Sequence, residues 1–378
     1  MIESLACLSI LFLTSFYWGE DFHGTRLIAA LTIGAFWFAG ILWRRVHPAA
    51  AILLEWVILS AAWHFAAPIS PYSNYGEVAA IALGGASAAA LATVLMTVVV
   101  LIFMRPMARG VLNAFAVACL LDSVFVLIQW LSGGNTFERG GFLGNTSINA
   151  CFIACTYPIL KRRPIKPKDA IGALWGLWTL LVPISAIIVS RSNMALASLL
   201  AAFLVPMLLR PGLFSARDWR RTLVFFVILL LTAHHFMGAK MGDDNGRVLV
   251  WRTCLEWWMH HANIWVGTGI GTFATFGANI QRVFLHRDDG YLLWMHNDWL
   301  QILFELGIGG LLLALLTFGA AIWRASRRQP LWIAASLAAF GTTMCGNYPL
   351  HLPMFGLLGG VLLALAFEPG LPRRPNGR

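Results

Sequence analysis

The strongest chemical signal in this 378-residue sequence is a polar triplet, His296-Asn297-Asp298, at the start of a long apolar stretch. Trp299 and Leu300 follow His296 by three and four residues, so on a helix they share its face. An imidazole held at the boundary between loop and lipid can act as a general base. The alternative is an interfacial histidine that takes no part in chemistry.

Three arginines are candidate partners of this base, because guanidinium groups bind phosphate oxygens through paired, charge-assisted hydrogen bonds. Arg191 stands between two apolar stretches in VSRSNMA, flanked by hydroxyls, although snorkelling from a helix end would also explain it. Arg247 and Arg252 are five residues apart in GRVLVWR, which separates them by about 140° on a helix. We expect one of the two to bind a ligand, and the sequence leaves open which.

A base beside cations suits a ligand that combines an anionic head at the lipid surface with a hydroxyl partner to be activated. A lipid pyrophosphate fits this description. Arginines would stabilise the leaving group as negative charge develops on it. A nearby guanidinium would also lower the pKa of His296, which keeps the imidazole neutral and able to accept a proton.

Neither a nucleotide nor a metal ion is favoured by the remaining polar motifs. The segment VGTGIGTF at 266–273 lacks the GxGxxG spacing and a P-loop lysine, so we interpret it as a backbone bend. The pairs at 243–244 and 288–289 are adjacent aspartates on turns, whereas a metal site needs ligands from several elements. We therefore predict no cofactor and no metal.

Glu305 lies nine residues beyond His296, which on a straight helix places it about 13 Å deeper and on the opposite face. We therefore expect Glu305 to form a hydrogen bond inside the protein rather than to pair with His296.

The elements that must position these residues are apolar helices. Hydrophobic residues make up 59% of the chain and charged residues 12%, whereas a soluble domain has roughly 25% charged residues. The net charge of +10 is spread over short clusters between apolar stretches. This is the distribution of loops held in the cytoplasm, and it offers no continuous basic face for nucleic acid.

We predict an all-α polytopic membrane protein, with a single transmembrane domain over residues 1–378 and both termini in the cytoplasm. About twelve spans are expected, at residues 4–18, 26–43, 48–66, 78–103, 110–131, 147–160, 170–190, 193–209, 222–237, 296–323, 330–347 and 351–367. An even number keeps the basic clusters on the cytoplasmic side. Residues 238–295 then form a large outer loop, in which RVLVWRTCLEWWMHHA can form an amphipathic helix at the membrane interface.

These motifs resemble those of bacterial O-antigen ligases and the related O-antigen polymerases over roughly residues 140–360. HNDWLQILFELGIGG matches the family pattern of His-Asn, nine residues, then Gly-x-x-Gly. Arg247 with the glycines that follow resembles the loop just before it, SRSNMALASLL the Arg-bearing outer turn, and GFLGNTSINA the Gly-Asn segment. The order of motifs and the twelve spans also fit this GT-C-like architecture. Asn347 stands where ligases often have an acidic residue, which leaves ligase and polymerase both open.

The resemblance implies an enzyme that moves a glycan from undecaprenyl pyrophosphate to an acceptor hydroxyl, on lipid A-core or a similar lipid or glycan. The reaction would take place on the periplasmic face of the bacterial inner membrane, without a metal. His296 would be the base, and Arg191 and Arg247 would bind the pyrophosphate. The residues that would support them are Arg252, Asn297 and Asn145.

A rival function from another class is transport of a lipid-linked glycan. Acidic residues within predicted spans could line a translocation path, namely Glu55, Asp122 and Glu305. Against this, the polar features crowd one face, and the sequence shows no obvious inverted repeat.

Overall fold

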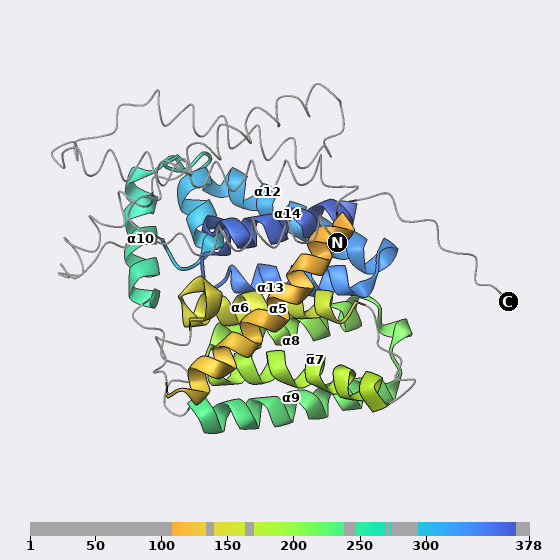
Figure 1. Ribbon diagram of the computed structural model, residues 1–378. Helices are drawn as coiled ribbons and strands as arrows, with labels where there is room; N and C mark the ends of the chain where they lie inside the picture. Colours follow the sequence, from red (N-terminus) through yellow and green to blue (C-terminus); the bar gives the residue numbers. More distant parts are fainter. Residues whose placement is uncertain are drawn as a thin grey trace.

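The computed structural model describes residues 108–133, 140–162, 170–237, 247–269, 273 and 294–367 (Figure 1). The first four predicted spans, Glu55 and the two aspartate pairs lie outside these ranges.

Each of the eight spans predicted from residue 110 onward corresponds to a helix. These helices are α5 (Ala108–Leu131), α6 (Thr146–Leu160), α7 (Ala170–Val189), α8 (Asn193–Leu209), α9 (Ala216–Met237), α12 (Asp298–Arg328), α13 (Leu331–Thr343) and α14 (Pro353–Phe367). Three segments are long and apolar enough to cross a membrane: Leu112–Leu131, Gly172–Val189 and Asp298–Arg328. Within the described residues the fold is therefore helical, as expected for an all-α membrane protein.

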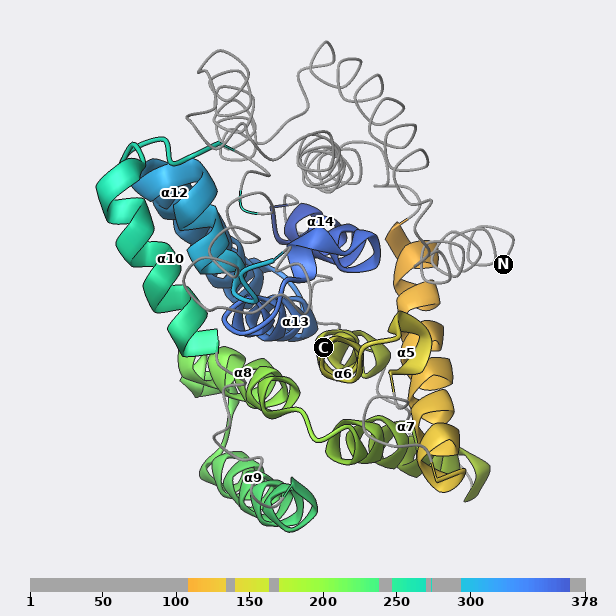
Figure 2. The same ribbon diagram turned by 90° about the vertical axis from the view of Figure 1, so that its left-hand side faces the viewer.

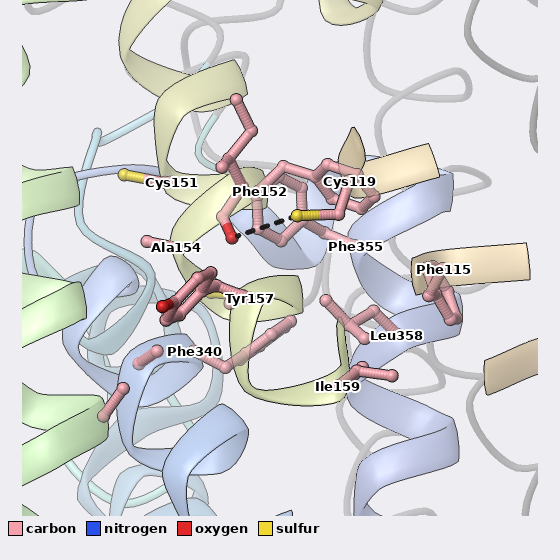
Figure 3. Close-up of a cluster of buried hydrophobic side chains, with 14 of the residues drawn as sticks. Phe115, Cys119, Cys151, Phe152, Ala154, Tyr157, Ile159, Phe340, Phe355 and Leu358 are labelled. Atoms are coloured by element: carbon pink, nitrogen blue, oxygen red, sulfur yellow. Dashed lines mark hydrogen bonds between the residues drawn. The ribbon is translucent and has the colours of Figure 1, made fainter. Parts of the chain in front are cut away.

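Helix α6 lies at the centre of the bundle, and every residue from Ile148 to Ile159 is buried. A helix that is apolar on all sides suits a protein interior or a membrane, and α6 is enclosed by its neighbours. Phe152 packs 6.2 Å from the Phe115 ring of α5 and 5.5 Å from the Phe355 ring of α14, measured between centroids (Figure 3). Cys119 donates a weak hydrogen bond to the Ile153 carbonyl at 3.9 Å.

The outward faces of α7, α9 and α12 are apolar rather than polar. Large exposed side chains include Leu174, Trp175 and Trp178 on α7, Leu223, Ile228 and Leu231 on α9, and Leu312, Leu316 and Trp323 on α12. A soluble protein rarely exposes continuous apolar surface of this kind. Together with the three spans, these faces identify a multi-pass membrane protein.

Helix α10 (Arg247–His261) forms within the predicted outer loop and crosses one end of the bundle instead of running along it (Figures 1 and 2). It reaches from α12 towards α8 (Figure 2). The turns preceding α6, α8 and α12 meet at this end, together with the turn from α13 to α14, as the hydrogen bonds below show.

The basic clusters lie at the opposite end of the bundle. Within the described part of the chain they lie at 161–162, at 217–221 and at 324–328, where α6 ends, α9 begins and α12 ends. This is the segregation of charge that the sequence predicted. That the α10 end faces the periplasm remains a prediction.

Candidate active site

His296 is the last residue but one before α12, in a turn fixed on both sides. Asn297 caps the helix, and its side-chain oxygen accepts a hydrogen bond from the Leu300 amide at 3.1 Å. This use of Asn is the usual way to satisfy a free amide at a helix start. The next residue, Asp298, donates its backbone amide to the Met344 carbonyl at 2.8 Å, which ties the turn to the end of α13.

Arg191 and His296 are the only non-glycine residues with positive φ among those described, with φ of 52° and 53°. This left-handed conformation costs an L-residue on the order of 1–3 kcal/mol and persists only where the surroundings impose it. Such strain gathers at functional sites. Both residues were candidates on chemical grounds alone, so the backbone supplies an independent reason to place function at them.

The His296 imidazole packs edge-on against the Tyr348 ring, with 4.9 Å between centroids. Its Nδ1 atom is buried and has no hydrogen-bond partner among the described residues. Burial and, to a lesser degree, the Arg247 guanidinium lower the pKa of His296 from 6.5 to about 4. The imidazole is therefore neutral near pH 7, as the sequence predicted, with burial as the larger cause.

Arg247 and Arg252 point to different surroundings. Arg247, the first residue of α10, is half-buried and donates from Nη1 to the Gly346 carbonyl at 2.6 Å. Arg252 is exposed and pairs with Glu256, at 2.7 Å between Nε and Oε1. Of the two, Arg247 is the arginine close enough to His296 to affect its pKa. That Arg247 binds the ligand stays a prediction.

Arg191 is linked to this group through the residue that follows it. Its guanidinium is exposed. Ser192 caps α8 by accepting from the Ala195 amide at 3.2 Å, and its hydroxyl lies 3.1 Å from that of Ser147 at the start of α6. Asn347, next to Gly346, donates to the Ser147 hydroxyl at 3.4 Å. The turn that carries Arg191 therefore lies in the same hydrogen-bonded cluster as the carbonyl that binds Arg247.

Asn145 has a structural role at the start of α6, where its side-chain oxygen accepts from the Ile148 amide at 3.1 Å. The Gly-Asn segment around it packs on α5, because the buried Asp122 carboxylate accepts from the Phe142 amide at 2.9 Å. Asn145 and Asn297 thus act as helix caps, and their oxygens are already engaged.

Two tryptophans attach α10 to α12. Trp251 donates from its ring nitrogen to the Met295 carbonyl at 2.6 Å, and Trp258 donates to the Phe304 carbonyl at 3.1 Å. The ring nitrogens of both tryptophans therefore point towards α12 and the turn before it. The position of α10 at the membrane interface stays a prediction. Trp251 also fixes the residue just before His296.

The glycine-rich bend after α10 packs into a break in α12. Gly307 has φ of 69°, and the helix is interrupted there. The Ile308 amide donates to the Ile264 carbonyl at 2.8 Å, while the Gly269 amide donates to the Glu305 carbonyl at 2.9 Å. The predicted bend is confirmed over its described residues, 266–269, whereas the break in α12 was not predicted. The break lies beyond Glu305, so the helix between Asp298 and Glu305 is uninterrupted.

Glu305 is buried beside this break. Its side chain accepts from Gln301 at 3.0 Å and from the Phe273 amide at 3.3 Å. The expected hydrogen bond inside the protein is confirmed. No set of three or more His, Cys, Asp or Glu side chains in the described ranges is arranged to hold a metal ion.

A family model described as O-antigen ligase matches residues 178–315. Over this segment the chain is similar to O-antigen ligases. The resemblance inferred from the sequence is thereby confirmed, over a narrower range than the one the motifs suggested. Arg191, Arg247 and His296 lie inside the matched segment, whereas Asn145 and Tyr348 lie outside it. No curated protein matches the chain at a significant level.

This family match supports the O-antigen ligase and polymerase superfamily, whose members are glycosyltransferase-like enzymes and imply lipid-linked glycan substrates. In the turn from α13 to α14, sequence reasoning singled out Asn347 but gave no role to Tyr348, the residue that contacts His296. The only sequence signal for Tyr348 was the aromatic and imidazole content of NYPLHLP.

Proposed function

We propose that the protein transfers a glycan from undecaprenyl pyrophosphate to an acceptor hydroxyl, on lipid A-core or a similar molecule, at the periplasmic face of the bacterial inner membrane. The observation that supports this most strongly is the buried, unpartnered Nδ1 atom of the neutral His296 beside Arg247. A buried ring nitrogen without a partner is costly unless a ligand completes it.

In the proposed reaction His296 accepts the proton of the acceptor hydroxyl as its oxygen forms a bond to the anomeric carbon. The bond from that carbon to the pyrophosphate oxygen breaks, and its electron pair leaves with the lipid pyrophosphate. Arg191 and Arg247 stabilise the negative charge that develops there. Because the guanidinium groups supply this stabilisation, the step needs no metal ion.

The low pKa of free His296 fits this sequence of events. A base with pKa of about 4 is weak, but it does not become protonated while the site is empty. Bound pyrophosphate brings negative charge next to the imidazole, which raises its pKa. The base is therefore strengthened when the donor is in place.

The test is complementation of a deletion strain with His296→Ala and with wild-type protein. We expect the variant to accumulate in the membrane and to attach no glycan, because proton acceptance is lost. Normal glycan attachment by His296→Ala would remove this residue from the mechanism.

The glycan profile of the same deletion strain separates ligase from polymerase. Loss of a ligase leaves full-length polymer on its lipid carrier and none on the lipid core. Loss of a polymerase leaves a core that carries a single repeat unit. We place the ligase first, since the matched family model is described by that activity.

A further inference from the structure

Tyr348 lies in the turn between α13 and α14, directly beside the candidate base. Its ring contacts the His296 imidazole edge-on at 4.9 Å and stacks with Trp294 at 6.0 Å between centroids. The residue is 6% exposed. Neither the motifs of the sequence nor the matched segment gives Tyr348 a role, because the match ends at residue 315.

The phenol of Tyr348 is available for a ligand. Most buried polar side chains have a partner, as Trp251 and Trp258 do. Among the described residues, the Tyr348 hydroxyl has no hydrogen-bond partner. Its oxygen atom is also not fully buried, so a ligand can reach it. Burial raises its pKa to about 12, against the opposing effect of Arg247. The hydroxyl therefore stays protonated near neutral pH and can donate.

The turn holds Tyr348 in place from both sides. Before it, the Met344 carbonyl accepts from the Asp298 amide and the Gly346 carbonyl accepts from Arg247. After it, the Leu350 amide donates to the Asp298 carboxylate at 2.8 Å, and His351 Nε2 lies 3.4 Å from the same carboxylate. A hydroxyl fixed in this way loses little freedom when it binds a ligand.

We propose that Tyr348 is a further donor-binding residue, whose phenol donates a hydrogen bond to a phosphate oxygen of the lipid pyrophosphate. The inference rests on the proposed function and deepens it. The ring contact places Tyr348 next to the candidate base. Its electrostatic coupling to Arg247 places it near the guanidinium that we propose binds the pyrophosphate. A neutral O–H beside a guanidinium suits a phosphate oxygen, because both groups donate to it.

The test compares Tyr348→Phe with Tyr157→Phe in the purified full-length protein. Each change removes one hydroxyl and keeps a buried ring. Tyr157 lies towards the other end of α6 and serves as the matched control. We expect Tyr348→Phe to lower kcat/KM for the lipid-linked donor by about 10- to 100-fold, the range for a lost hydrogen bond to a charged group. Inhibition by inorganic pyrophosphate should weaken in parallel.

Unchanged transfer and unchanged pyrophosphate inhibition in Tyr348→Phe would overturn the proposal and leave only a packing role. If His296→Ala then remained inactive, the proposed function would stand without Tyr348. If His296→Ala were active as well, the proposed function itself would fall.

A second variant distinguishes the loss of a hydrogen bond from a folding defect in Tyr348→Phe. Trifluorotyrosine at position 348 keeps the ring and hydroxyl but lowers the phenol pKa. Transfer should then fall as the pH rises through the lowered pKa, because a phenolate cannot donate and repels phosphate. A pH profile identical to that of the wild type would contradict a donating role.

Discussion

At the residue scale, the proposed chemistry depends on how strongly His296 resists protonation. Its pKa is lowered first by burial and second by Arg247, so both the fold and a neighbouring cation keep it neutral. An ordinary histidine would be half-protonated near pH 6.5. A base must be neutral to accept a proton, so activity is lost as the pH falls through the pKa, not as it rises.

The first prediction is that kcat/KM for transfer holds from pH 8 down to about pH 5 and falls only as the pH approaches 4. This parameter reports the pKa values of the free enzyme, which is the state described here. The measurement is a pH series with purified protein in detergent. A loss centred near pH 6.5 would show that His296 is not kept neutral by its surroundings, or is not the base.

The second prediction separates the arginines. Arg247→Ala and Arg191→Ala should each lower transfer by about 100-fold or more, as for other donors that stabilise a developing anion. Arg252→Ala is the matched control on the same helix, since its exposed pair with Glu256 contributes little. Initial rates in membranes with equal protein levels provide the measurement.

The melting temperature of Arg247→Ala should be determined alongside, because Arg247 also donates to the Gly346 carbonyl. Equal rate losses at all three arginines would contradict the assignment.

At the element scale, the candidate base is positioned by α10 and the bend that follows it. The interruption of α12 at Gly307 leaves backbone groups without helical partners, and residues 264–269 supply those partners. These two segments approach each other so closely that a Cβ atom at Gly307 would lie 2.3 Å from the Trp265 carbonyl oxygen. A Cβ at Gly267 would likewise lie 2.5 Å from Glu305 backbone atoms.

The third prediction follows from this close contact. Gly307→Ala should destabilise the protein by more than about 3 kcal/mol, since backbone atoms and a positive φ both oppose the new methyl group. Gly319→Ala is the control in the same helix, where nothing lies within 4 Å, and it should be neutral or stabilising by up to about 1 kcal/mol. Thermal unfolding in detergent measures both. Equal melting temperatures would mean that the bend does not support α12.

Apolar periodicity and run length were sufficient to predict the helices, because these properties are local. The break in α12 was not predictable in this way, since its partners come from a loop about 40 residues earlier. The choice of Arg247 over Arg252 likewise depended on Gly346, roughly 100 residues away. The sequence indicated His296 as a candidate base, and this role stays a prediction. The burial that dominates its pKa and the contact with Tyr348 arise only when four turns meet.

At the scale of the whole molecule, the account requires the α10 end of the bundle to face the periplasm. Cys345 is exposed at this end, whereas Cys119, Cys151, Cys155 and Cys254 are buried. Cys7 lies outside the described residues and would be replaced by alanine.

The fourth prediction is that a membrane-impermeant maleimide labels Cys345 in intact spheroplasts. A cysteine introduced at Arg327, in a Cys345→Ser background, should be labelled only after the membrane is opened, because it lies at the opposite end of α12. The reverse pattern would place the candidate site in the cytoplasm.

The central claim is that His296, at a site lined by Arg247 and Arg191, catalyses glycan transfer rather than transport. The most direct measurement is transfer from a lipid-pyrophosphate-linked oligosaccharide to lipid A-core in proteoliposomes containing EDTA. The account predicts that wild-type protein forms the glycosylated acceptor and releases the lipid pyrophosphate, and that His296→Ala forms neither. Movement of the labelled donor across the bilayer without acceptor consumption, or equal transfer by His296→Ala, would contradict it.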